Sequence, residues 1–121
     1  MVVELSMPLL KLETSVGLND EKKKTVLAAL SRAVADIIGK PEQYVMITTS
    51  QAAILMSGKA GDAAFVDIRS IGGLNSETNR KLSQQICNLL KDSLGIAPDR
   101  IYLNFTDVEA GNWGWNGSTF G

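Results

Sequence analysis

The sequence has 121 residues, of which 45% are hydrophobic and 21% charged, and its formal net charge is −1. This is the composition of one globular domain rather than of a disordered chain. A nearly neutral chain is not expected to bind nucleic acid or an anionic membrane through bulk charge. No apolar run approaches the roughly 20 residues of a membrane-spanning helix, and no signal peptide opens the chain. We therefore expect a cytoplasmic protein, with release from the cell without a signal peptide as the alternative.

Two residue types exclude further functions through their scarcity. The chain has no histidine, which excludes Ser-His-Asp and Cys-His hydrolysis and most zinc sites. Its single cysteine, Cys87, can form neither an intrachain disulfide nor a CxxC redox pair, and its place on a helix predicts a core residue. Any general base must be a carboxylate, a lysine, a tyrosine or an N-terminal amine. We expect no metal and no other cofactor.

A helix is predicted between Asn19, which suits an N-cap, and Gly39, which suits a C-terminal stop. A second helix is predicted between Asn75 and Gly95, with both ends 56 residues further on. In each helix apolar residues recur every fourth position, as they do along one helical face. They are Val26, Leu30, Val34 and Ile38 in the first helix, and Leu82, Ile86, Leu90 and Leu94 in the second. The repeat indicates a duplicated unit.

Alternating strand patterns flank both helices, over 10–14 and 44–49 in the first unit and over 66–70 and 102–106 in the second. Each strand-helix-strand crossover makes its two strands parallel. The apolar positions share one face of the sheet; they are Leu10, Leu12, Val45, Ile47, Val66, Ile68, Leu103 and Phe105. The prediction is an α/β (α+β) two-layer sandwich, with both helices on one face of a four-stranded mixed sheet. The polar face must meet water or the sheet of another subunit.

Two segments lie outside the duplication. Residues 51–62 predict a short strand at 54–56 and then a glycine-containing turn. Residues 111–121 contain both tryptophans and four glycines. Such a tail either docks on its own core, or builds a subunit interface or lines a pocket.

The remaining polar motifs leave the function open. Residues 70–75 join a strand to a helix and could hold an anion on backbone N–H groups, but they lack the glycine spacing of a nucleotide-binding loop. Asp67 and Arg69 share one strand face, which favours a cross-strand ion pair over an acid/base dyad.

Four segments together resemble the macrophage migration inhibitory factor family, which belongs to the tautomerase superfamily. They are GKPEQY at 39–44, SIGG at 70–73, PDRIY at 98–102 and WGWNGSTF at 113–120. Met7-Pro8 resembles the family's start, where the methionine is removed and the proline becomes the first residue. The resemblance covers 8–121 and leaves 1–7 as an extension of a single domain spanning 1–121. It implies a homotrimer, in which the polar faces and the tails meet neighbouring subunits.

The resemblance also implies a keto-enol tautomerase acting on phenylpyruvate-like or dopachrome-like aromatic keto acids. Its base would be the secondary amine of Pro8, with a pKa lowered by burial and by a nearby cation. The residues implied to bind substrate are Lys40 and the backbone N–H of Ile71 for its oxygens, Tyr102 and Asn104 from a neighbouring subunit, and Trp113, Trp115 and Phe120 as the apolar wall.

The residues ahead of Pro8 depart from the family pattern and leave two hypotheses. Seven residues precede Pro8, so its nitrogen is a tertiary amide with no basic lone pair. The first hypothesis is a tautomerase that is active only when Pro8 is freed. The second is a catalytically silent trimeric module that binds a receptor or another protein partner, or signals in the manner of a cytokine.

Overall fold

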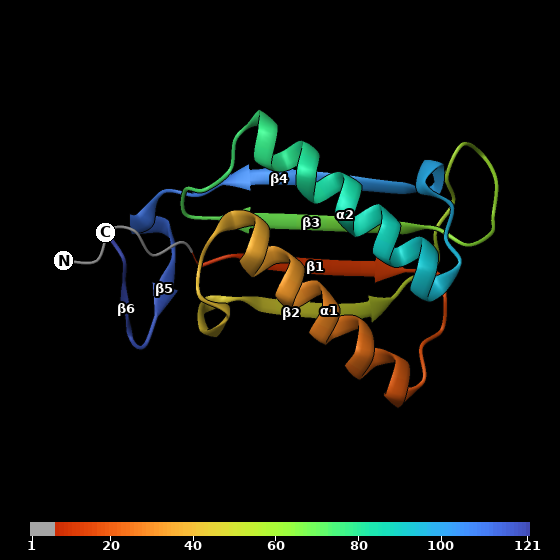
Figure 1. The fold of residues 1–121 in the computed structure, drawn as a ribbon, viewed down its shortest axis with the longest axis horizontal. Helices are drawn as coiled ribbons and strands as arrows, with labels where there is room; N and C mark the ends of the chain where they lie inside the picture. The colour runs from red at the N-terminus through yellow and green to blue at the C-terminus, as the bar shows by residue number, and fades with distance from the viewer. Residues whose placement is uncertain (1–6) are drawn as a thin grey trace.

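The computed structural model describes residues 7–121 and has two layers, a four-stranded sheet with two helices on one face (Figure 1). The first unit consists of β1 (Leu9–Thr14), α1 (Asp20–Ile38) and β2 (Met46–Gln51). The second consists of β3 (Ala64–Ser70), α2 (Ser76–Leu94) and β4 (Ile101–Asp107). Short 3-10 turns lie at Glu42–Tyr44 (η1), Pro98–Arg100 (η2) and Ala110–Asn112 (η3), and the chain ends with β5 (Gly114–Trp115) and β6 (Ser118–Thr119).

The sheet has the strand order β2-β1-β3-β4. Strands β1 and β2 are parallel, as are β3 and β4, while the central pair β1 and β3 is antiparallel. The predicted two-layer duplicated fold is therefore confirmed. One predicted strand boundary is wrong, because Tyr44 belongs to η1 and β2 begins at Met46.

Both helices begin and end where the sequence predicts. The side chain of Asn19 accepts a hydrogen bond from the backbone N–H of Lys22 at 2.8 Å, and Asn75 accepts one from Thr78 at 2.9 Å. Gly39 and Gly95 end the helices with φ of 81° and 72°, a left-handed conformation that glycine adopts without a steric penalty.

The core lies between the helices and the sheet, and its largest side chains come from the predicted apolar positions. Those that are essentially inaccessible to solvent are Leu10, Leu12, Val26, Leu30, Val34, Val66, Ile68, Leu82, Ile86 and Leu90. The side chains of Ile38 and Leu94, at the helix ends, are only partly buried against this cluster. No helix in the described part of the chain is long and apolar enough to cross a membrane.

The sheet face without helices carries an ion pair, but not the cross-strand pair that the sequence suggested. Arg69 donates from Nε and Nη2 to Oδ2 of Asp67, at 3.1 and 2.9 Å, within the same strand. Residues two apart in a strand lie on the same face, which allows this contact. Asp67 has two cross-strand neighbours: Asn104 on β4, which donates from Nδ2 to Oδ1 at 3.1 Å, and Lys11 on β1, which the register places opposite it.

The prediction of a strand at 54–56 is wrong. In the described chain this region forms only an isolated bridge between Met56 and Lys59. Arg100 binds the loop instead, with its guanidinium donating to the carbonyls of Met56 at 2.8 Å, Lys59 at 3.1 Å and Asp62 at 3.2 Å. The carbonyls of Met56 and Lys59 also accept backbone N–H bonds from each other at 3.0 and 3.1 Å, so the guanidinium adds a second donor to each.

We predict that Cys87 reacts slowly with thiol reagents. It lies half-buried on α2 against the core, and burial raises the pKa of its thiol. At pH 8 a smaller fraction is then thiolate than in an unstructured peptide, and the thiolate is the nucleophile. Alkylation by iodoacetamide should be slower than in a cysteine peptide and should reach the peptide's rate in denaturant. Rapid alkylation of the folded protein, or disulfide reductase turnover that disappears in Cys87→Ser, would contradict this.

Candidate active site

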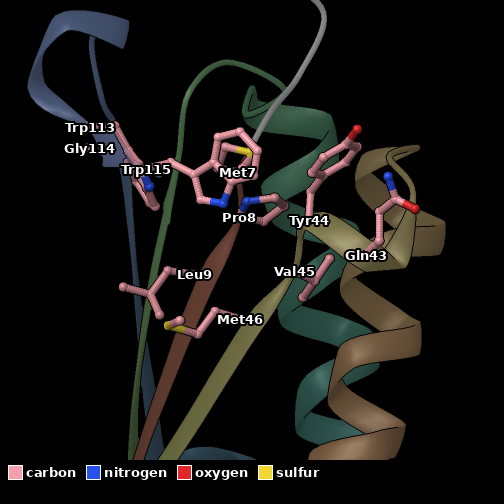
Figure 2. A pocket seen from close by; sticks show the side chains of 10 residues that line it. All are labelled: Met7, Pro8, Leu9, Gln43, Tyr44, Val45, Met46, Trp113, Gly114 and Trp115. Atoms are coloured by element: carbon pink, nitrogen blue, oxygen red, sulfur yellow. The ribbon is translucent and has the colours of Figure 1, made fainter. Parts of the chain in front are cut away.

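A cavity of about 430 Å³ opens at the end of the sheet where β1 and β2 begin. Figure 1 shows the β5-β6 hairpin beside this end of the sheet. Figure 2 shows the side chains that surround it. The lining residues are Met7, Pro8, Leu9, Gln43, Tyr44, Val45, Met46, Trp113, Gly114 and Trp115. None of these residues is a lysine, an arginine or a carboxylic acid, so the cavity is an apolar and aromatic space.

Pro8 lies at the centre of this arrangement, immediately before β1. It is buried, and its carbonyl accepts a hydrogen bond from the backbone N–H of Met46 at 3.0 Å. This bond continues the β1-β2 ladder by one residue and fixes Pro8 at the cavity wall. Met7 also lines the cavity and is only 6% exposed.

The tail forms one aromatic wall of the cavity. Asn116 and Gly117 have φ of 53° and 79°, the pair of positive values that a two-residue type I′ turn requires. This turn folds β6 back on β5, and Phe120 donates its backbone N–H to the carbonyl of Trp113 at 3.2 Å. The rings of Trp115 and Phe120 stack with their centroids 5.9 Å apart. In the described chain the tail therefore lines a pocket, one of the alternatives that the sequence left open.

The opposite wall comes from η1 and was missed as part of the site. Gln43 and Tyr44 line the cavity, and Figure 2 shows Pro8 between Tyr44 and the two tryptophans. Tyr44 is placed by a tight turn, because its backbone N–H bonds to the carbonyl of Pro41 at 3.1 Å. Both residues belong to the GKPEQY segment, which carries part of the family resemblance. No periodicity in that segment indicated that their side chains face the cavity.

Three of the eight predicted site residues line the cavity directly, namely Pro8, Trp113 and Trp115. Phe120 does not line the cavity but stacks on Trp115. Lys40 and Ile71 are half-buried, the first just after α1 and the second just after β3, and neither lines the cavity.

Neither Tyr102 nor Asn104 lines the cavity of its own chain, and Tyr102 lies the further from it. Tyr102 pairs with Phe65, which in turn pairs with Glu13, four residues along β1 from Leu9. At about 3.3 Å per residue this places Tyr102 roughly 13 Å from the cavity end of the sheet. Its side chain is 67% exposed. Within residues 7–121 no three His, Cys, Asp or Glu side chains gather closely enough to hold a metal ion.

A duplicated β-α-β sheet, with a proline before the first strand and a cavity beside it, is the fold of the tautomerase superfamily. A family model described as macrophage migration inhibitory factor matches residues 7–121. The chain is 37% identical over 115 residues to the macrophage migration inhibitory factor of Meriones unguiculatus, covering 94% of this chain and 99% of that protein. The chain therefore belongs to the macrophage migration inhibitory factor family.

Solved structures agree with this assignment. A macrophage migration inhibitory factor-like protein from Entamoeba histolytica is 35% identical, with a TM-score of 0.91, and covers 94% of this chain and 99% of its own. A homologue from Prochlorococcus marinus is 38% identical, with a TM-score of 0.88, and covers 93% and 99% of the two chains. The family match begins at Met7, immediately before Pro8.

Proposed function

We propose that the chain is a keto-enol tautomerase of phenylpyruvate-like aromatic keto acids, with the amine of a freed Pro8 as general base. The observation that carries this proposal is the burial of Pro8 against an aromatic cavity of about 430 Å³. Burial lowers the pKa of an amine, because it disfavours the charged form, and so increases the neutral fraction near pH 7.

The reaction needs one base and one aromatic binding space. The neutral amine takes a proton from the carbon next to the carbonyl. The electron pair of the C–H bond forms the C=C bond of the enolate, and the π pair of the carbonyl moves to its oxygen. The protonated amine then returns the proton to that oxygen, giving the enol, and the reverse sequence restores the ketone. Trp113, Trp115 and Tyr44 offer flat apolar surfaces for the substrate ring.

We propose supporting roles for the remaining residues. Lys40 and the backbone N–H of Ile71 bind substrate oxygens, and Phe120 supports Trp115. Tyr102 and Asn104 complete the cavity of a neighbouring subunit, which is supported for Tyr102 by its distance from the cavity of its own chain. The deciding experiment measures phenylpyruvate tautomerisation by absorbance for the 121-residue chain and for a form that begins at Pro8.

A second candidate function is a binding or signalling module without catalysis. The observation that favours it is Met7, whose side chain is buried in the cavity lining, ahead of a Pro8 nitrogen that is an amide in the 121-residue chain. If the form beginning at Pro8 is folded and still fails to convert phenylpyruvate, the second candidate is retained and the first is rejected.

We further propose that the protein assembles as a homotrimer. One sheet face has no helices, and the outer strands β2 and β4 each keep an edge that no described strand covers. Leu55 and Tyr102 are 72% and 67% exposed, and an interface that covered them would remove apolar surface from water.

Light scattering of the protein at micromolar concentration should give three times the mass of one chain. Deletion of residues 112–121 should weaken the assembly, because without the tail a strand edge of the neighbouring subunit would be exposed. The four-stranded sheet does not include the deleted residues. Gln84→Ala on the exposed face of α2 is the matched control and should leave the mass unchanged. A stable monomer of the intact chain would contradict the proposal.

A further inference from the structure

A second cavity adjoins the one beside Pro8. It has a volume of about 300 Å³ and is lined by Leu9, Arg69, Val108, Asn112, Trp113 and Gly114. The two cavities share Leu9, Trp113 and Gly114, so they meet at these residues. The second cavity differs from the first in one chemical respect, because its lining contains a cation, Arg69.

The register of the sheet places Arg69 close to Pro8. Arg69 pairs with Leu9 in the antiparallel β1-β3 ladder, and Leu9 directly follows Pro8. Paired residues in such a ladder have Cα atoms about 4.5–5.5 Å apart. Leu9 and Arg69 both point to the sheet face without helices, and the side chain of Arg69 is 49% exposed. The Cα atom of Arg69 is therefore within one strand spacing of Leu9, while its guanidinium is bound to Asp67 on the same face and remains accessible to a ligand.

Asp67 holds the guanidinium in place without using all of its donors. Nε and Nη2 both donate to Oδ2 of Asp67, and Asn104 fixes the other carboxylate oxygen. A guanidinium has five N–H donors, including two on Nη1, and presents them in a fixed plane that suits a carboxylate. Lys11 pairs with Asp67 on the same face, so Lys11, Asp67 and Arg69 together carry a net charge of +1.

An aromatic keto acid needs such a cation. Its ring fits the first cavity, whose lining has no charged side chain, but a carboxylate left there without a partner would be strongly destabilised. We propose that Arg69 binds the carboxylate of the ligand, while Trp113 and Trp115 contact its ring. This inference rests on the proposed function and deepens it, because it assigns aromatic carboxylic acids to the site through a residue of β3.

Binding can be measured without catalysis. The probes are 3-phenylpropionate and its neutral analogue 3-phenylpropionamide, and the signal is tryptophan fluorescence, since both tryptophans of the chain line the first cavity. In the form beginning at Pro8, Arg69→Gln should weaken binding of the carboxylate about tenfold or more and leave the amide unaffected. Arg69→Lys should recover part of the loss, because it restores the charge but not the planar fork.

Two controls separate charge recognition from a change of structure. Arg80→Gln removes a charge from the exposed side of α2 and should change neither affinity. Arg69→Gln removes the ion-pair partner of Asp67. The double variant Asp67→Asn/Arg69→Gln removes the carboxylate as well. It should lose affinity for 3-phenylpropionate and keep its affinity for the amide. Carboxylate affinity that survives in both variants, or amide affinity that falls equally, would overturn the proposal.

A kinetic comparison distinguishes this inference from the proposed function. With phenylpyruvate, Arg69→Gln should raise KM with little change in kcat, as expected for loss of uniform binding. If no form converts phenylpyruvate, the tautomerase proposal fails, while the two-probe binding result still decides the role of Arg69.

Discussion

Removal of residues 1–7 is expected to raise the rate of phenylpyruvate tautomerisation by about 10²–10⁴-fold, the range typical of general-base catalysis. In the 121-residue chain the Pro8 nitrogen is an amide, which cannot accept a proton near neutral pH. In the shortened form it is a secondary amine at the wall of the aromatic cavity. The shortened form also lacks the buried side chain of Met7, which lines the cavity in the 121-residue chain.

Variants of the shortened form test the role of the amine. Pro8→Gly keeps a primary amine at the same position and should retain a reduced rate. Lys40→Ala should weaken substrate binding, and it should raise the pKa of the amine if the ammonium group of Lys40 lies near it. Equal rates for the long and short forms, with mass spectrometry confirming an intact Met1, would show that Pro8 is not the base.

Shortening a buried side chain on the apolar face of either helix should strongly destabilise the fold. Leu30 on α1 and Ile86 on α2 are 56 residues apart, and both are fully inaccessible to solvent. We expect Leu30→Ala and Ile86→Ala each to lower the free energy of unfolding by about 2–5 kcal/mol, through lost apolar burial and the cavity left behind. Urea unfolding at one fixed protein concentration measures this change, because assembly would make apparent stability depend on concentration.

The matched control lies on the same helix. Gln84 is exposed on α2, so Gln84→Ala should change the free energy of unfolding by no more than about 0.5 kcal/mol. If both core variants lower the free energy of unfolding by less than about 1 kcal/mol, the apolar faces of the two helices do not form the common core.

The helix ends, and the face of the sheet that the helices cover, could be predicted from the sequence. Asn19 and Gly39, with their counterparts Asn75 and Gly95, define the helix ends through local backbone chemistry, and the structure confirms all four. The alternation of apolar residues was enough to assign the covered face of the sheet, because strand side chains have a strict period of two. These features depend on near neighbours in the chain, and so they are legible in the sequence.

The tertiary structure alone decided which residues share a site. Tyr44 lines the cavity because it belongs to a 3-10 turn rather than to a strand. Tyr102 does not line it, because β4 begins at the far end of the sheet. Arg69 lies beside Leu9 only through the antiparallel register of β1 and β3. Residues 54–56 form no strand, because strand formation requires a partner edge that the described chain does not bring to them. Each of these outcomes depends on contacts between distant segments, which spacing along the chain does not encode.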